Sequence, residues 1–264
     1  PAATAAAEWP DPVSSPAEAM PLATRSLLLD AAPTAQGYVV VGDRGHVLLS
    51  ADGRNWTQSA DVPVRVMLTA VTARGDALWA VGHEGVIVHS NDGGTHWVVQ
   101  HRDTYDADGE AASDDPRHGA PLLDVLFTDD RHGIAVGSYS RLLVTRDGGA
   151  TWNAETLAVA PAPEAAAAVK PAKPATGEAA DDGSMGFSED ELALGEESDP
   201  HLNAIARTGN GNLMILAERG SAFRSRDDGA TWQRIRLPYD GSMFGAIGYA
   251  GDRVLAYGLR GHVF

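Results

Sequence analysis

Hydrophobic residues occur along this chain in short runs, separated by turns rich in Gly, Asp and Asn. The clearest example lies at residues 67–101, where the segments MLTAVTA, ALWAVG, GVIVHS and THWVVQH follow one another. Short runs rich in Val, Ile, Leu and Trp between such turns are typical of β-strands. These stretches show no sustained apolar period of 3.6 residues, which would indicate a helix. The pattern therefore predicts an all-β protein.

The strand pattern belongs to a repeated unit. Each unit has a strand ending in a pair such as Val-Gly, a Gly or Ser three residues later, and a Ser/Thr-x-Asp turn followed by Trp; the last copy shows only its first part. The units begin at Val41, Val81, Val136, Leu216 and Tyr257, so their starts lie 40, 55, 80 and 41 residues apart. A period of about 40 residues is that of a four-stranded propeller blade. We predict a β-propeller with about five visible blades.

The Ser/Thr-x-Asp turn has a direct physical interpretation. The hydroxyl and the carboxylate can accept hydrogen bonds from backbone N–H groups of a tight turn. The Gly that follows permits a positive φ, and the Trp packs beneath the turn and holds two strands together. Because every blade needs the turn, we interpret its Asp as structural and not catalytic. The turn residues are Ser50, Asp52 and Trp56; Ser90, Asp92 and Trp97; Thr145, Asp147 and Trp152; and Ser225, Asp227 and Trp232.

Four copies of this turn in register identify it as an Asp-box, or bacterial neuraminidase repeat. With the preceding V-G-x-x-G hairpin, the units resemble Asp-box propellers of the photosystem II assembly and stability factor type. The resemblance implies a seven-bladed, non-enzymatic protein that helps to assemble membrane complexes, so that two or more blades would lie outside this chain. Bacterial relatives outside photosynthetic lineages accompany exporters of the resistance-nodulation-division (RND) class. An RND-type exporter is therefore the membrane protein partner that we expect.

The formal charge of −16 is concentrated in two segments. Residues 103–116 hold six acids and residues 175–200 hold nine, and outside them 21 acids stand against 20 bases. Such acidic segments repel phosphate, so a nucleic-acid partner is not expected. We assign the chain to an N-terminal tail at 1–25 and a propeller at 26–264, which carries an acidic loop insert at 103–118 and an Ala/Pro-rich, disordered acidic insert at 155–199.

The start of the chain, PAATAAAEWPDP, has the small residues found around a signal-peptidase site. We expect an exported, periplasmic protein whose signal peptide is removed; a disordered cytosolic start is the alternative. No stretch approaches 18 uninterrupted apolar residues, so direct membrane insertion is not expected. Cysteine is absent, which excludes disulfides and thiolate metal sites within this sequence.

One position of the repeat varies, and it offers the best indication of function. It precedes the second Gly of V-G-x-x-G and is occupied by Arg44, Glu84, Tyr139, Arg219 and Arg260. Equivalent hairpins surround one face of a propeller, where several Arg can bind carboxylates or phosphates. The resembling assembly factors use an arginine patch for partner binding, which we carry over to Arg44, Arg219 and Arg260; Glu84 and Tyr139 depart from it. The alternative is a set of solvated Arg with local carboxylate neighbours.

A second partner-binding element is predicted at the end of the long insert, in FSEDELALG. Ser188 and Glu191 form a capping box, and Phe187 and Leu192 form a hydrophobic staple. The alternative is a transient helix in a solvated tether.

Two other functional classes remain open. Sialidases share the fold and combine three Arg with a Tyr and a Glu, but the order of these residues differs here and the Phe/Tyr-Arg-Ile-Pro motif is missing. A glycan-binding module would need aromatic platforms, and Tyr139 is the only aromatic residue at the varied position. The nine His show no carboxylate at a recognisable metal spacing. We therefore predict no catalytic residue, metal or cofactor.

Overall fold

The structure is a computed structural model, and it describes residues 11–104, 115–159 and 199–264. In these residues eighteen strands form five antiparallel sheets, four of them four-stranded and the last two-stranded. Each four-stranded sheet is a simple meander in chain order. The predicted all-β propeller fold is confirmed, with one sheet per repeat unit.

Each sheet forms one blade. Blade 1 contains β1 (Leu28–Thr34), β2 (Gly37–Gly42), β3 (Val47–Ser50) and β4 (Thr57–Gln58). Blade 2 contains β5 (Leu68–Arg74), β6 (Ala77–Gly82), β7 (Ile87–Ser90) and β8 (Val98–His101). Blade 3 contains β9 (Leu122–Phe127), β10 (Gly133–Gly137), β11 (Leu142–Thr145) and β12 (Asn153–Ala154). Blade 4 contains β13 (Leu202–Arg207), β14 (Leu213–Ala217), β15 (Ser221–Ser225) and β16 (Gln233–Arg236). Blade 5 contains β17 (Met243–Gly248) and β18 (Val254–Gly258).

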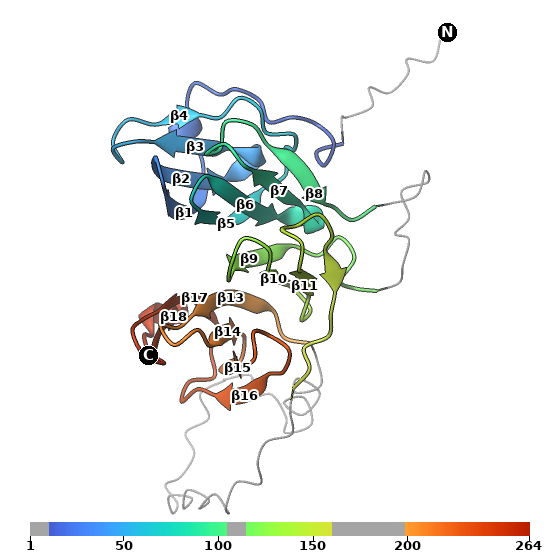
Figure 1. The fold of residues 1–264 in the computed structure, drawn as a ribbon, viewed down its shortest axis with the longest axis vertical. Helices are drawn as coiled ribbons and strands as arrows, with labels where there is room; N and C mark the ends of the chain where they lie inside the picture. The colour runs from blue at the N-terminus through green and yellow to red at the C-terminus, as the bar shows by residue number, and fades with distance from the viewer. Residues whose placement is uncertain (1–10, 105–114, 160–198) are drawn as a thin grey trace, which may run out of the picture.

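The blades follow one another in a curved row from β1 to β18 (Figure 1). The first strand of each blade contacts the first strand of the next, so β1, β5, β9, β13 and β17 line the inner side. Single 3-10 turns complete the fold: η1 (Ala23–Arg25), η2 (Asp43–Gly45), η3 (His83–Gly85) and η4 (Leu259–Gly261). No helix in the described parts of the chain is long and apolar enough to cross a membrane.

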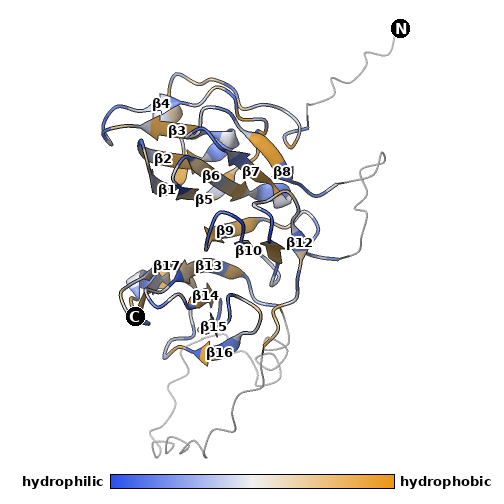
Figure 2. Cartoon of the chain, in the orientation of Figure 1, coloured by the Kyte–Doolittle hydropathy of each residue, from blue (hydrophilic) through white to orange (hydrophobic). Residues whose placement is uncertain are grey.

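The hydrophobic core lies in the seams between blades. Apolar strand residues dominate the central strands, as the hydropathy colouring shows (Figure 2). One buried cluster joins Val39 and Val41 of blade 1 to Leu78 and Val88 of blade 2. Further clusters join blades 2 and 3 and blades 3 and 4 in the same way. Stability therefore depends on contacts between neighbouring repeats, as in other repeat architectures.

Polar side chains of the first strands add a hydrogen bond across each seam. Asp30 Oδ2 accepts from the Val71 N–H at 2.8 Å, and Thr69 Oγ1 donates to the Leu122 carbonyl at 2.6 Å. Continuing along the row, the Ile205 N–H donates to Asp124 Oδ2 at 2.8 Å, and Asn203 Nδ2 donates to the Met243 carbonyl at 2.9 Å. Each first strand carries a bulge beside these residues, in the same register. The four seams thus share one device made from different residue types.

The Asp124 carboxyl makes the seam between blades 3 and 4 sensitive to pH. Burial raises its pKa to about 7, against the lowering effect of the Ile205 and Val125 N–H donors, and Asp30 adds a smaller raising effect. Between about pH 4 and pH 7 the folded chain then binds more protons than the unfolded chain. We expect the contribution of Asp124 to the free energy of unfolding to fall as the pH rises through this window. Chemical denaturation at several pH values should show that this contribution is lost in Asp124→Asn and retained in Asp228→Asn, at an exposed position.

Part of the segment assigned to the N-terminal tail packs against blade 1. Val13 is buried in the core cluster between blades 1 and 2. The Arg65 N–H donates to the Pro12 carbonyl and the Ala17 N–H donates to the Val62 carbonyl. No strand pattern marks this segment, because its residues pack against the blades through a turn and irregular chain without joining a sheet. The predicted docking residues Phe187 and Leu192, by contrast, lie outside the described residues.

Candidate partner-binding face

The varied position lies at the tip of the hairpin between the second and third strands of each blade. In blade 1, Arg44 has φ 55° and ψ 32° and is followed by Gly45 with φ 71°, and the His46 N–H donates to the Asp43 carbonyl at 2.9 Å. Two successive left-handed residues closed in this way form a type I′ turn. The same closing hydrogen bond is present in the other four blades. All five varied residues therefore take equivalent places in the fold.

All five varied residues have a left-handed backbone. Their φ values lie between 53° and 59°. For a residue with a β-carbon this conformation costs about 1 kcal/mol or more, and type I′ turns favour Asn or Gly. The next position is constrained as well, since a β-carbon on Gly45 would collide with the Val64 carbonyl oxygen. Long side chains thus occupy a site that Gly or Asn would fill with less strain.

Four of the five tip residues are exposed and one is half-buried. Arg44, Arg219 and Arg260 are exposed, and Arg44 Nε lies 3.5 Å from Oδ2 of its neighbour Asp43. Tyr139 is also exposed and meets the His201 ring edge-on, with 5.1 Å between the ring centroids. Glu84 is half-buried. We call these five residues the tip residues; three of them carry a positive charge.

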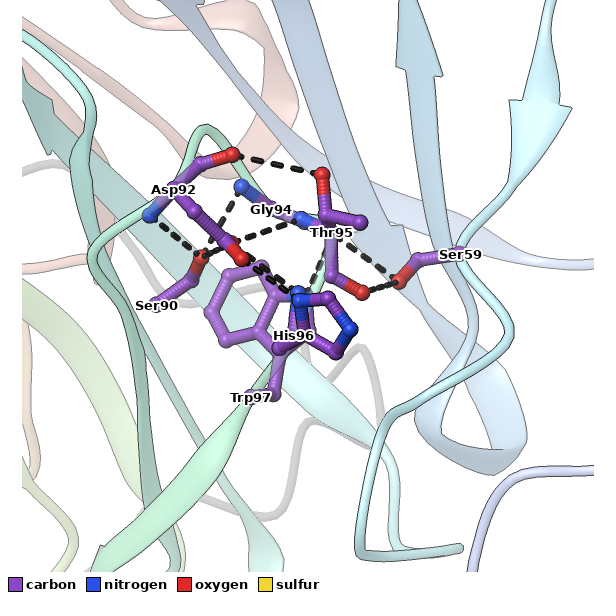
Figure 3. A network of polar contacts seen from close by, with 7 residues as sticks. All are labelled: Ser59, Ser90, Asp92, Gly94, Thr95, His96 and Trp97. Carbon is purple, nitrogen blue, oxygen red and sulfur yellow. Dashed lines mark hydrogen bonds and ion pairs between the residues drawn. The ribbon is translucent and has the colours of Figure 1, made fainter.

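The opposite end of each four-stranded blade carries the Ser/Thr-x-Asp turn. In blade 2, Asp92 Oδ1 accepts from the Ser90 hydroxyl at 2.8 Å and from the His96 N–H at 3.0 Å. Ser90 Oγ accepts from the Gly94 N–H at 2.9 Å, and the Trp97 indole donates to the Gly94 carbonyl (Figure 3). The hydroxyl thus accepts a hydrogen bond from a backbone N–H and donates one to the carboxylate. The hydroxyls of the other three turns do the same.

These turn carboxylates are poorly suited to proton transfer. The donors to Asp92, first of them the His96 N–H, hold the pKa of its carboxyl well below the ordinary value. The pKa values of the Asp52 and Asp147 carboxyls are also lowered, again chiefly by backbone N–H donors. A general acid must hold a proton near the working pH. The turn geometry therefore matches a structural role.

Three of the four turn Trp residues lie at seams between blades. Trp97 packs among residues of blades 1 and 2, and Trp232 packs among residues of blades 3 and 4. Trp152 is less buried and lies at the edge of the cluster between blades 2 and 3. The expected role of holding two strands together is thus extended at Trp97 and Trp232, where the ring also packs against the neighbouring blade.

A buried ion pair beside the tip of blade 2 could not be foreseen from the sequence. Arg141 donates two hydrogen bonds of 2.7 Å to Asp103, and the two side chains are only 6% and 10% exposed. Asp103 also accepts from the Gly119 N–H at 2.8 Å. Asp103 stands at the start of the segment that we predicted to be an acidic loop insert. The one indication of a buried charge in the sequence was Arg141, which stands at the repeat position that Val86 occupies in blade 2.

Comparisons with known proteins agree with this architecture. The sequence model of the family described as photosynthesis system II assembly factor YCF48 matches residues 10–104 and 116–168. The photosystem II assembly lipoprotein Ycf48 of Synechococcus sp. (strain CC9902) is 26% identical over 257 residues, which cover 96% of this chain and 62% of that protein. The Ycf48 of Prochlorococcus marinus is 28% identical over 135 residues, or 42% of this chain and 35% of its own length.

Solved structures show the same fold. A structure described as YCF48 bound to D1 peptide has a TM-score of 0.54 at 14% identity, and the match covers 96% of this chain and 63% of that one. YCF48 from Cyanidioschyzon merolae has a TM-score of 0.53 at 18% identity, with 96% and 67% covered. The chain thus spans about three fifths of the length of the Synechococcus relative.

Proposed function

From the premise that this chain belongs to the family of photosynthesis system II assembly factor YCF48, we propose that it is a non-catalytic propeller that binds a membrane protein and helps to assemble its complex. The family is one of assembly factors and not of enzymes, which agrees with the prediction of no catalytic residues. A relative solved with a D1 peptide supports a segment of a membrane protein as the kind of partner. The proposal places partner binding on the face that carries Arg44, Glu84, Tyr139, Arg219 and Arg260.

The observation that carries this assignment is the conformation of the tip residues. Strained, exposed positions that hold large or charged side chains persist where a function favours those side chains. Arg adds planar, bidentate donors that suit carboxylates on a partner. The tip face also carries three Arg, whereas the excess negative charge of this sequence lies in the two acidic segments. An acidic or carboxylate-bearing segment is therefore the partner chemistry that fits best.

Removal of the three tip arginines tests this proposal. In the triple variant R44N/R219N/R260N we expect partner binding to weaken by about tenfold or more, because charge-assisted hydrogen bonds are lost. Thermal stability should stay equal or rise slightly, since Asn tolerates the left-handed conformation better than Arg. Co-purification from native membranes and thermal unfolding measure the two effects separately.

The matched control removes three exposed arginines from the opposite end of the blades. Arg54 lies in a Ser/Thr-x-Asp turn, and Arg131 and Arg253 lie in the hairpins between the first and second strands. The variant R54N/R131N/R253N should bind as the unchanged protein does. Equal loss in both triple variants would indicate a general charge effect and contradict a binding face at the tips.

The narrower expectations from the sequence form part of the proposal. We interpret the Ser/Thr-x-Asp turns as Asp-boxes, and we place the protein in the periplasm, where an RND-type exporter would be its membrane partner. The family match supports a membrane protein complex in general, and the exporter rests on the resemblance of the repeat units. Affinity purification of the full-length protein from native membranes, followed by mass spectrometry, tests this point. Recovery of other membrane proteins without an exporter would reject the exporter and retain the assembly role.

A further inference from the structure

Two of the seams between blades are closed at their outer side by an extended segment. At the seam of blades 1 and 2, the Trp97 N–H donates to the Asp61 carbonyl at 3.2 Å, and Asp61 forms a parallel bridge with His96. At the seam of blades 3 and 4, the Trp232 N–H donates to the Ala158 carbonyl at 2.9 Å, and Val159 forms a parallel bridge with Trp232. In both cases a short extended segment pairs with the chain at the Trp that directly precedes the fourth strand of the next blade.

Among residues 11–104, 115–159 and 199–264, no such closure is found at the seam of blades 2 and 3. Within the described residues, the Trp152 N–H donates no hydrogen bond to an extended segment, and no parallel bridge forms there. A cavity of about 430 Å³ opens at this place. Leu143, Trp152 and Ala154 are among its apolar lining residues, and the Asp103–Arg141 ion pair is part of its polar wall.

The closed seams show what kind of segment fits such a place. Val62 and Val64 are fully buried where they follow Asp61, and Leu157 packs against the core beside Ala158. Val88 in the closed seam corresponds to Leu143 in the open one, since both are the second residue of the third strand. The seam of blades 2 and 3 therefore has an equivalent apolar residue, Leu143, at its base. The Asp103–Arg141 ion pair borders this seam, whereas Val62 and Val64 cover the seam of blades 1 and 2.

We propose that the cavity between blades 2 and 3 binds an extended peptide segment of a protein partner, with a branched aliphatic side chain against Leu143 and Trp152 and a backbone carbonyl on the Trp152 N–H. This is recognition by addition of a strand, in which main-chain hydrogen bonds supply affinity and side-chain pockets supply selectivity. A volume of about 430 Å³ lies in the range of ligand sites and suits two or three residues.

The cavity lies beside the proposed partner-binding face. The Asp103 N–H donates to the Glu84 carbonyl at 3.3 Å, and the His101 ring nitrogen lies 2.8 Å from the Gly85 carbonyl oxygen. One wall of the cavity is thus attached to the hairpin tip of blade 2. A peptide held at the tip residues can continue into the seam, so the inference extends the proposed function and rests on it for the identity of the partner.

The test uses a peptide that this fold is already known to accommodate. The synthetic octapeptide SADVPVRV copies residues 59–66, which close the first seam. In ¹⁵N-labelled protein we expect the Trp152 amide to exchange with solvent at least tenfold faster than the amides of Trp97 and Trp232. Addition of the octapeptide should slow exchange at Trp152 and shift the resonances of Leu143 and Ala154. A Trp152 amide that is already protected in the free protein would overturn the proposal.

Two matched variants locate the effect. Ala154→Trp fills the cavity and should abolish the response to the octapeptide. Asn153→Trp adds the same ring at an exposed neighbour that does not line the cavity, and should bind as before, because adjacent strand residues point to opposite sides. The octapeptide with Val62→Ser and Val64→Ser should not bind. Equal binding to both protein variants, or to both peptides, would reject the seam as the site.

The tip variant R44N/R219N/R260N separates this inference from the proposed function. It should bind the octapeptide as the unchanged protein does, whereas its recovery of the membrane partner should fall. If the octapeptide fails to bind while the tip variant loses its partner, the seam site is wrong and the tip face stands. If the octapeptide binds at Trp152 and the tip variant retains its partner, the tip face is wrong and the seam remains as a peptide site.

Discussion

Replacing Trp232 by alanine is expected to lower the free energy of unfolding by about 3–5 kcal/mol. The Trp232 side chain is 1% exposed and packs with Ile134 of blade 3 and Phe223 of its own blade. Its removal therefore leaves a cavity in the seam that joins the two blades. Urea denaturation followed by circular dichroism measures the change, and a loss below about 1 kcal/mol would show that the ring does not join the blades.

Trp232→Phe and Asp227→Ala are the comparisons for this variant. Within the described residues, the buried Trp232 indole nitrogen has no hydrogen-bond partner, so phenylalanine should retain much of the stability. Asp227 is an exposed turn residue that accepts from the Thr231 hydroxyl and N–H. Its loss should cost about 1–2 kcal/mol, since those groups can bond to water instead. The expected order is thus Trp232→Ala, then Asp227→Ala, with Trp232→Phe nearest to the unchanged protein.

The repeat turn could be predicted from the sequence because all of its contacts are local. Ser90, Asp92 and Trp97 lie within eight residues of one another, and their spacing determines which backbone groups they reach. The hairpin tips were predictable for the same reason: the varied residue and its following Gly lie within one type I′ turn. The four-stranded blades were predictable from the order of the strands, because each meander pairs strands that are neighbours in sequence.

The seams could not be predicted in this way, because they join residues from different repeats. Asp124 and Ile205 are 81 residues apart, and Asp103 and Arg141 are 38 apart. A polar residue in an apolar strand, such as Asp124 in LLDVLF, signals a need for a partner but does not name it. The acidic composition around Asp103 favoured a solvated loop, and only the fold shows that this carboxylate is turned toward a buried cation.

Asp103→Ala is expected to have the second large effect, a fall of about 3–5 kcal/mol in the free energy of unfolding. Removal of a carboxylate from an exposed loop would change the free energy of unfolding very little. The variant leaves the Arg141 guanidinium, which is 6% exposed, with the Ala120 carbonyl as its remaining hydrogen-bond acceptor among the described residues. It also removes the acceptor of the Gly119 N–H. Asp115→Ala is the control, because this acid is more exposed and pairs with Arg117 near the surface.

The double variant D103V/R141V decides whether the loss comes from an unpaired buried charge. Valine already occupies the place of Arg141 in blade 2, at Val86, where it is fully buried. If the penalty of Asp103→Ala is chiefly the stranded cation, removal of both charges should restore most of the stability, because aliphatic side chains can replace a buried ion pair. We expect a coupling energy of about 2 kcal/mol or more from a double-mutant cycle with the two single valine variants. Additive losses in the cycle would instead mean that the two side chains act separately, and the seam would then owe its stability to the Gly119 and Ala120 backbone contacts.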